Sequence, residues 1–210
     1  MNTQPALDLF ERIAKQLPGL LAPLTDDGPA VVEQARQEFA AMAPDLAYLD
    51  KPNTPLAGAL WMCAAHLAAY QVVRKSGIDA HAYGARMLQH MAGAPVNEEQ
   101  DASEEVFDLS GVERTHPGEF EVENVSDEQF DWGVNIKSCA ICYLFSQHDA
   151  MDLVPYMCAS DDVVSDLNNQ GLQRTGTIAL GAHQCDFRYK SGGAGLAVAA
   201  QYPDKIKLLG

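Results

Sequence analysis

Cysteines gather in the last third of the chain. Four of the five lie there, at Cys139, Cys142, Cys158 and Cys185, and the fifth is Cys63. Cys139 and Cys142 form a C-x2-C pair, which shares one face if the segment is a helix. Four thiolates can in principle hold zinc. Zinc sites of this kind normally contain two C-x2-C pairs and only one is present, so we predict no metal or other cofactor, with zinc as the alternative.

The segment 181–188, Gly-Ala-His-Gln-Cys-Asp-Phe-Arg, is the densest in reactive groups. Alternation along a strand would place His183 and Cys185 on one face and Asp186 and Arg188 on the other. An imidazole beside a thiol can take its proton and produce a nucleophilic thiolate. The alternative is structural: Cys185 packs in the core, while Asp186 and Arg188 form an exposed ion pair. Spacing alone favours the structural interpretation.

The first ninety residues have the apolar spacing of amphipathic helices. Pro18-Gly19 is expected to end the first helix, Pro29 to lie in the first turn of the second, and Thr54-Pro55 to begin the third. Gly77 is a plausible stop for that third helix. The predicted helices cover residues 7–17, 29–42, 56–75 and 80–91.

The pattern changes to an alternation of period two after residue 118. Strands are expected near Phe120 to Val122 and at 130–137, helices at 139–148 and 155–167, and further strands at 172–180 and 184–190. Short connections favour antiparallel neighbours. We therefore predict an α+β fold, in which a helical N-terminal half packs with a C-terminal antiparallel sheet and two helices.

Negative charge is concentrated in one stretch. Residues 98–131 contain thirteen acidic residues and one basic residue, Arg114, so this stretch carries −12 of the net charge of −15. We expect it to be solvated, and the charge argues against nucleic-acid binding. The predicted organisation is a helical region at 1–97, an acidic linker at 98–118 and an α+β region at 119–210, together forming one compact domain.

The bulk properties also predict a cellular location. No segment approaches the roughly 18 apolar residues that would cross a bilayer, and the N-terminus lacks the pattern of a secretory signal. We expect a cytoplasmic protein with reduced thiols that does not bind membranes. A small-molecule substrate is its expected partner, and a homo-oligomer is left open.

The order of features after residue 138 is similar to that of a known family. Cys139 follows a strand end, Cys158-x2-Asp161 lies in a helix, Arg174-Thr-Gly-Thr-Ile-Ala-Leu-Gly181 follows, and Cys185-Asp186-Phe187-Arg188 closes the run. This arrangement resembles the L-2-amino-thiazoline-4-carboxylic acid hydrolase family. The closely similar part covers about a quarter of the chain.

The resemblance implies hydrolytic opening of a small cyclic amidine-like ring, such as 2-amino-thiazoline-4-carboxylate, to a carbamoyl-cysteine. Such a reaction needs a nucleophile or an activated water, a proton donor and a cation for the substrate carboxylate. The alternative is a non-catalytic small-molecule-binding or sensory domain of the same fold. We expect Cys139, Cys158, Asp161 and Cys185 to converge. The predicted catalytic residues are Cys185 as nucleophile, Asp161 as acid or base and His183 as a helper, and the predicted substrate-binding residues are Cys139, Cys158, Arg188 and Asp186.

Overall fold

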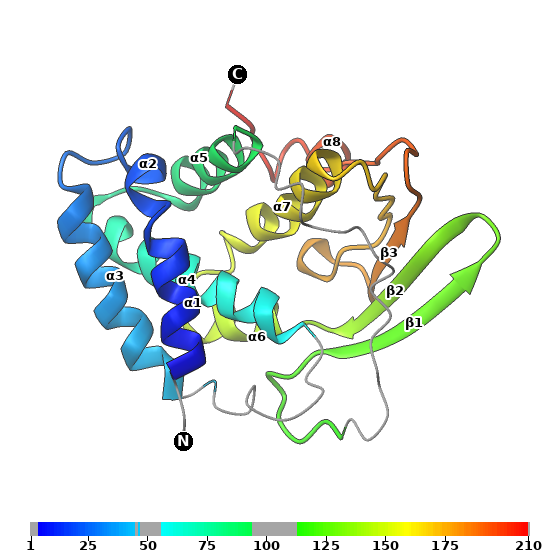
Figure 1. Cartoon of the computed structure of the whole chain (residues 1–210), viewed down its shortest axis with the longest axis horizontal. Coiled ribbons are helices and arrows are strands. Elements are labelled where there is room, and N and C mark those ends of the chain that lie inside the picture. Colours follow the sequence, from blue (N-terminus) through cyan, green and yellow to red (C-terminus); the bar gives the residue numbers. More distant parts are fainter. Residues whose placement is uncertain (1–3, 45, 47–55, 94–112, 210) are drawn as a thin grey trace.

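The computed structural model describes residues 4–44, 46, 56–93 and 113–209. Helices α1 to α5 form one side of the molecule, and a three-stranded sheet forms the other (Figure 1). Helices α6 and α7 lie between them. The predicted α+β class, with a helical N-terminal half and a C-terminal antiparallel sheet, is confirmed.

The helical half begins with α1 (Gln4–Ala14), α2 (Leu17–Leu21) and α3 (Gly28–Met42). The first helix ends at Ala14, before Pro18-Gly19, and Pro18 lies instead in the first turn of the short α2, where its missing N–H has no helical partner to lose. At α3 the Asp27 side chain accepts a hydrogen bond from the Ala30 N–H at 3.3 Å, and Pro29 lies in the first turn as predicted.

The next helices are α4 (Ala57–Val73), extended by the 3₁₀ helix η2 (Arg74–Ser76), and α5 (Ala80–Ala92). Gly77, with a φ of 88°, ends η2 as predicted, because glycine adopts this left-handed conformation without strain. Thr54 and Pro55, the predicted start of the helix, lie outside the described residues. Helix α4 packs against α1 and α3 on one side and α6 on the other, so it is buried on most of its surface.

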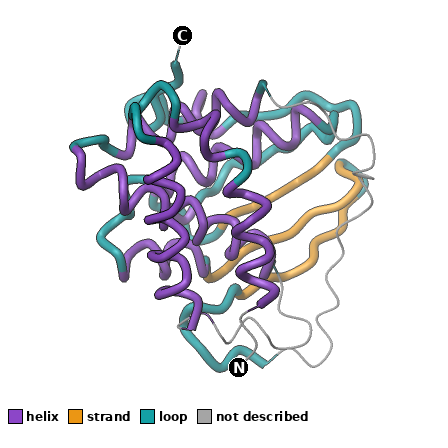
Figure 2. Tube along the Cα trace, turned by 60° about the vertical axis from the view of Figure 1, so that its left-hand side comes forward, coloured by secondary structure: helices purple, strands orange, loops and turns teal. Residues whose placement is uncertain are grey.

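The C-terminal half contains β1 (Glu121–Asp127), β2 (Phe130–Ser138) and β3 (Cys185–Tyr189), paired antiparallel in that order. Figure 2 shows the strands with the helices to one side. In the register of β2 and β3, Ile136 lies opposite Cys185, and the stacked rings of Trp132 and Tyr189 are 3.8 Å apart. The pairing therefore turns Cys185 toward the same side as the buried residues of β2.

Four further elements complete this half: α6 (Ala140–Gln147), α7 (Val154–Leu167), the 3₁₀ helix η3 (Ile178–Leu180) and the short α8 (Val198–Gln201). The strand predicted at 172–180 is wrong. Gln173 makes only isolated bridges, to Arg188 and to Leu196, and the chain then turns into η3. The backbone N–H groups of Thr175 and Gly176 donate to the Asp186 carboxylate instead of a strand partner, which diverts the segment from the sheet.

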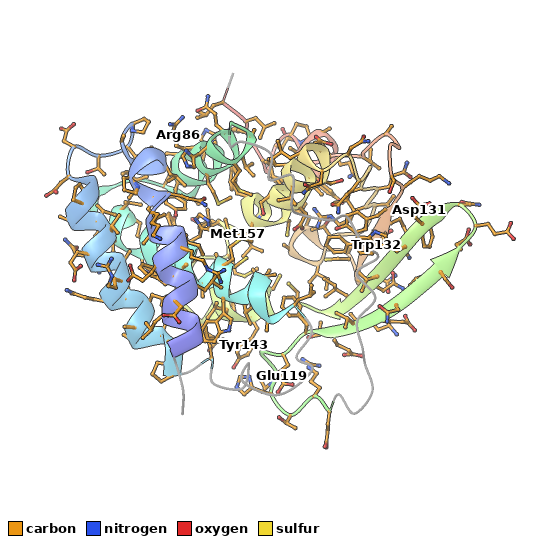
Figure 3. The ribbon with its side chains drawn as sticks, in the orientation of Figure 1. Arg86, Glu119, Asp131, Trp132, Tyr143 and Met157 are labelled. Atoms are coloured by element: carbon orange, nitrogen blue, oxygen red, sulfur yellow. The ribbon has the colours of Figure 1, made fainter. Side chains whose placement is uncertain are left out.

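The two halves meet mainly where α5 packs on α7. Gly84 of α5 leaves room for the Tyr156 ring: a Cβ atom at Gly84 would lie 2.3 Å from Tyr156 Cγ. The Tyr156 hydroxyl is 3.0 Å from His81 Nδ1 on the same helix α5. Met157, 5 % exposed, comes from α7 into the middle of the molecule (Figure 3).

The acidic stretch is only partly described, because residues 98–112 and the predicted boundary at 97 lie outside the described residues. Within 113–131 most acidic side chains are exposed, as expected. Glu119 is the exception at 5 % exposure, and its carboxylate accepts a hydrogen bond from the Thr115 hydroxyl at 3.1 Å. Among the described helices, none is both long and apolar enough to cross a membrane.

Candidate active site

Cys139 stands where strand β2 changes into helix α6. It is the N-cap residue, with extended backbone angles (φ −101°, ψ 111°), and the first helical residue is Ala140. The Cys142 side chain and the backbone N–H groups of Ile141 and Cys142, in the first turn of α6, lie near the Cys139 side chain. These groups lower the pKa of Cys139, although burial opposes the shift. The interaction with Cys139, together with burial, raises the pKa of Cys142.

Helix α7 supplies Cys158 and Asp161, which are three residues apart and so share a helix face. Arg174, from the segment after α7, is only 1 % exposed and donates to Asp161 Oδ2 at 2.7 Å and to the Cys158 carbonyl at 2.5 Å. Its guanidinium also lies 4.6 Å from the centre of the Phe187 ring. A buried cation thereby fixes the position of Asp161.

Cys185 reaches the same place from β3. It is 4 % exposed, and its sulfur accepts a hydrogen bond from the Ile178 N–H at 3.3 Å. Burial raises the pKa of Cys185 to about 11, and the charges of Cys139 and Asp161 add to that shift. The charge of Cys158 helps to raise the pKa of Cys142. The charges of Cys139, Asp161 and Cys185 in turn help to raise the pKa of Cys158. Cys139, Cys158, Asp161 and Cys185 are thus within electrostatic range of one another, and their role as one site stays a prediction.

Cys63 of α4 borders this group from the helical half. It is 3 % exposed, and burial together with the charges of Asp161 and Cys139 raises its pKa. The sequence assigned Cys63 to no site, because its position in an Ala-rich stripe indicates only packing. Helix α4 therefore lies beside the elements that carry the C-terminal cysteines.

Solvent reaches the site through Asp161. Its side chain is 41 % exposed, whereas that of its partner Arg174 is 1 % exposed. Burial nevertheless raises the pKa of Asp161, and the Arg174 charge only partly offsets the shift. Cys139, Cys142 and Cys158 are also partly exposed. An exposed carboxyl group and three partly exposed thiols thus border this region.

Three predicted site residues take other positions. His183 is exposed in the bend before β3, and within the described part of the chain its ring makes no hydrogen bond. The Asp186 carboxylate accepts from the Thr175 hydroxyl at 2.6 Å and from two backbone N–H groups. Arg188 donates to Asn135 Oδ1 at 2.8 Å and lies over the Phe130 ring. Asp186 and Arg188 thus hold the strand and its neighbouring loop.

Arg174 and Cys142 are the residues that sequence reasoning missed. Arg174 lies in the family motif, but the sequence analysis assigned it no role. A lone cation in an otherwise uncharged run is a signal for a buried ion pair. Cys142 was considered only as a zinc ligand. In the described part of the chain, no three or more His, Cys, Asp or Glu side chains are arranged to hold a metal ion.

Comparison with known proteins gives the site a family. A family model described as L-2-amino-thiazoline-4-carboxylic acid hydrolase matches residues 59–189, from the start of α4 to the end of β3. No curated protein and no solved structure matches the chain significantly. The matched region contains all five cysteines, Asp161 and Arg174. Because the match covers more than half of the chain, the protein belongs to the L-2-amino-thiazoline-4-carboxylic acid hydrolase family.

Proposed function

We propose that this protein hydrolyses a small cyclic amidine-like ring, such as 2-amino-thiazoline-4-carboxylate, to a carbamoyl-cysteine, and that Cys139 is the nucleophile. The observation that carries the proposal is the position of the partly exposed Cys139 at the N-terminus of α6, within electrostatic range of the accessible Asp161 carboxyl group. A thiolate is the reactive form of cysteine, and the lowered pKa of Cys139 favours this form.

The sequence-based assignment of Cys185 as nucleophile stays untested, but its environment supports it less well. Cys185 is 4 % exposed, and burial raises its pKa to about 11, so it is a neutral thiol near pH 7. His183, its expected helper, is exposed. We assign Cys185 and Cys158 to the wall of the site and Cys139 to the reaction.

In the proposed reaction the Cys139 thiolate attacks C2 of the ring, and the C2–S bond breaks. The departing ring sulfur takes a proton from the Asp161 carboxyl group, whose raised pKa suits a proton donor. This leaves an isothiourea linked to Cys139. Water then adds to C2, Asp161 accepts its proton, and the Cys139 thiolate leaves. One ring and one water therefore give one carbamoyl-cysteine.

Arg174 is a positioning residue in this scheme. It is too buried to contact the substrate, but its hydrogen bonds to Asp161 and to the Cys158 carbonyl fix the carboxyl group relative to α7. The predicted substrate-binding roles of Arg188 and Asp186 remain predictions. Both side chains already have protein partners, at Asn135 and Thr175 respectively.

The test is turnover of 2-amino-thiazoline-4-carboxylate by the full chain, followed by mass spectrometry of carbamoyl-cysteine. We expect Cys139→Ser to lower kcat by about 10³-fold or more and Asp161→Asn by about 10²–10⁴-fold, with circular dichroism showing retained folds. A quenched wild-type reaction should contain a substrate adduct on Cys139.

Cys185→Ser decides between the two nucleophiles. Loss of activity and of the adduct in Cys185→Ser, with full activity in Cys139→Ser, would reverse our assignment. Full activity in both variants would remove the thiols from the mechanism. A wild-type protein that binds the ring compound, seen as a raised Tm, without turning it over would point instead to the non-catalytic binding domain.

A further inference from the structure

Cys139 and Cys142 form a pair that the hydrolytic mechanism does not need. Cys139 caps helix α6 and Cys142 lies in its first turn, so both sulfurs face the same side of the helix. Because Cys139 is the N-cap and Cys142 the third residue of α6, the two side chains are neighbours at the start of the helix. Cβ atoms three residues apart on a helix are about 5–6 Å apart, and a disulfide requires roughly 3.5–4.5 Å, so a small shift of the N-cap would close it.

The other cysteines are less suited to this pairing. Cys63 belongs to α4 and is only 3 % exposed. The Cys185 sulfur accepts a hydrogen bond from the Ile178 N–H. Cys158 is near, but burial raises its pKa well above the usual range. Cys139 and Cys142 are both partly exposed, so an oxidant in solution can reach them.

We propose that Cys139 and Cys142 are a site of reversible oxidation, in which a hydroperoxide converts the pair to a disulfide and thereby switches the active site off. In the first step the Cys139 thiolate attacks the peroxide oxygen, the O–O bond breaks, and the alcohol or water leaves as Cys139 becomes a sulfenic acid. In the second step the Cys142 sulfur attacks the Cys139 sulfur, and water leaves as the S–S bond forms. Two thiols lose two electrons to one peroxide, and a dithiol reductant reverses the change.

The switch follows from the position of Cys139. The disulfide uses the Cys139 sulfur, so no thiolate remains at the N-terminus of α6. This effect on ring opening rests on the proposed function, whereas formation of the disulfide does not. The C-x2-C pair is therefore assigned to redox control rather than to zinc.

The test treats the full chain with hydrogen peroxide, blocks remaining thiols with N-ethylmaleimide in denaturant, and counts them by mass. We expect free thiols to fall from five to three, because one disulfide consumes two of the five. Cleavage after Trp132 and Tyr143 gives a peptide, 133–143, that contains only Cys139 and Cys142, and it should be two hydrogen masses lighter. Dithiothreitol should restore both thiols and any ring-opening activity lost.

Two variants sharpen the assignment. In Cys142→Ser the serine hydroxyl can still donate to the Cys139 sulfur, so oxidation should stop at a Cys139 sulfenic acid that dimedone traps. In Cys139→Ser, Cys142 should keep its thiol at the same peroxide dose. A disulfide that joins Cys139 to Cys158 or Cys185 in the wild type would overturn the proposal. So would a Cys142→Ser protein that still loses two thiols reversibly, or a wild type in which Cys139 goes straight to sulfinic acid.

The results of the oxidation test and of the hydrolysis test can contradict one proposal without the other. A wild type that forms the Cys139–Cys142 disulfide but opens no ring contradicts the proposed function and leaves the oxidation site standing. A wild type that opens the ring at an unchanged rate after complete disulfide formation shows that Cys139 is not the nucleophile, and this overturns the switch.

Discussion

The two halves of the molecule differ in what they bury. In α1 to α5 the buried side chains are hydrophobic, and the buried Tyr83 hydroxyl is 3.0 Å from His66. In the C-terminal half, by contrast, polar and charged groups are buried as well. Within the described residues they are Glu119, Ser160, Asp162, Ser165, Arg174 and Thr177.

This difference places the buried polar and charged groups in the same half as the candidate site. Burying a charged group is unfavourable unless partners compensate it, so buried ions mark places where position matters more than stability. Around Arg174 the compensation is incomplete: its Nε and Asp162 Oδ1 have no hydrogen-bond partner among the described residues. The helical half supplies an apolar support, and the C-terminal half supplies the reactive groups.

The largest expected effect comes from removing the buried cation. Arg174→Met leaves Asp162, whose side chain is 10 % exposed, as a buried charge without a cation nearby. We expect the free energy of unfolding to fall by about 3–5 kcal/mol, measured by denaturant titration. The control is Arg36→Met in α3, because Arg36 pairs with Glu11 on the surface and the expected loss is about 0–1 kcal/mol. Equal losses in the two variants would remove the distinction between the halves.

The second prediction concerns the pH dependence of stability. Burial raises the pKa of Asp162 from 3.8 to about 6, and the Arg174 charge only partly offsets this. The folded protein therefore holds the Asp162 proton more tightly than the unfolded chain, so this contribution to stability is present below about pH 4 and is lost as the pH rises to about 6.

Asp162→Asn should remove that slope. The stability of wild type relative to Asp162→Asn should fall by about 2–3 kcal/mol between pH 4 and pH 7, measured by urea unfolding at each pH. The asparagine can still accept the hydrogen bond that Asp162 Oδ2 receives from the Val198 N–H at 2.7 Å. Parallel stability curves for the two proteins would show that the Asp162 charge is adequately compensated.

The smallest expected effect tests the contact between the halves. Gly84→Ala would place a methyl group 2.3 Å from Tyr156 Cγ, so α5 or α7 must shift. We expect a loss of about 1–3 kcal/mol, measured as a lowered denaturant midpoint. Gly58→Ala in the first turns of α4 is the control, because nothing lies within 4 Å of the new atom. The control should be neutral or stabilising by up to about 1 kcal/mol. A Gly84→Ala protein as stable as the control would mean that the interface is loosely packed.

The sequence alone determined the local elements and the group of residues that would meet. Helix α3 follows from Asp27, Pro29 and the apolar spacing after them, because capping and periodicity are local properties. The proximity of Cys139, Cys158, Asp161 and Cys185 could be predicted because helices α6 and α7 and strand β3 each have one face that must be buried, whereas their joint role stays a prediction. A match to the family added the expected reaction but not the role of each thiol.

Only the tertiary structure decided which groups are reactive. Cys139 and Cys185 are chemically identical in the sequence. They differ because Cys139 is partly exposed at a helix N-terminus, while Cys185 is buried and accepts a hydrogen bond from the Ile178 N–H. The segment 172–180 has a strand pattern, but Asp186, ten residues beyond Gly176, binds its backbone N–H groups. Such contacts join residues far apart in the chain, and the pKa of a thiol depends on its surroundings in space, so neither could be derived from periodicity or spacing.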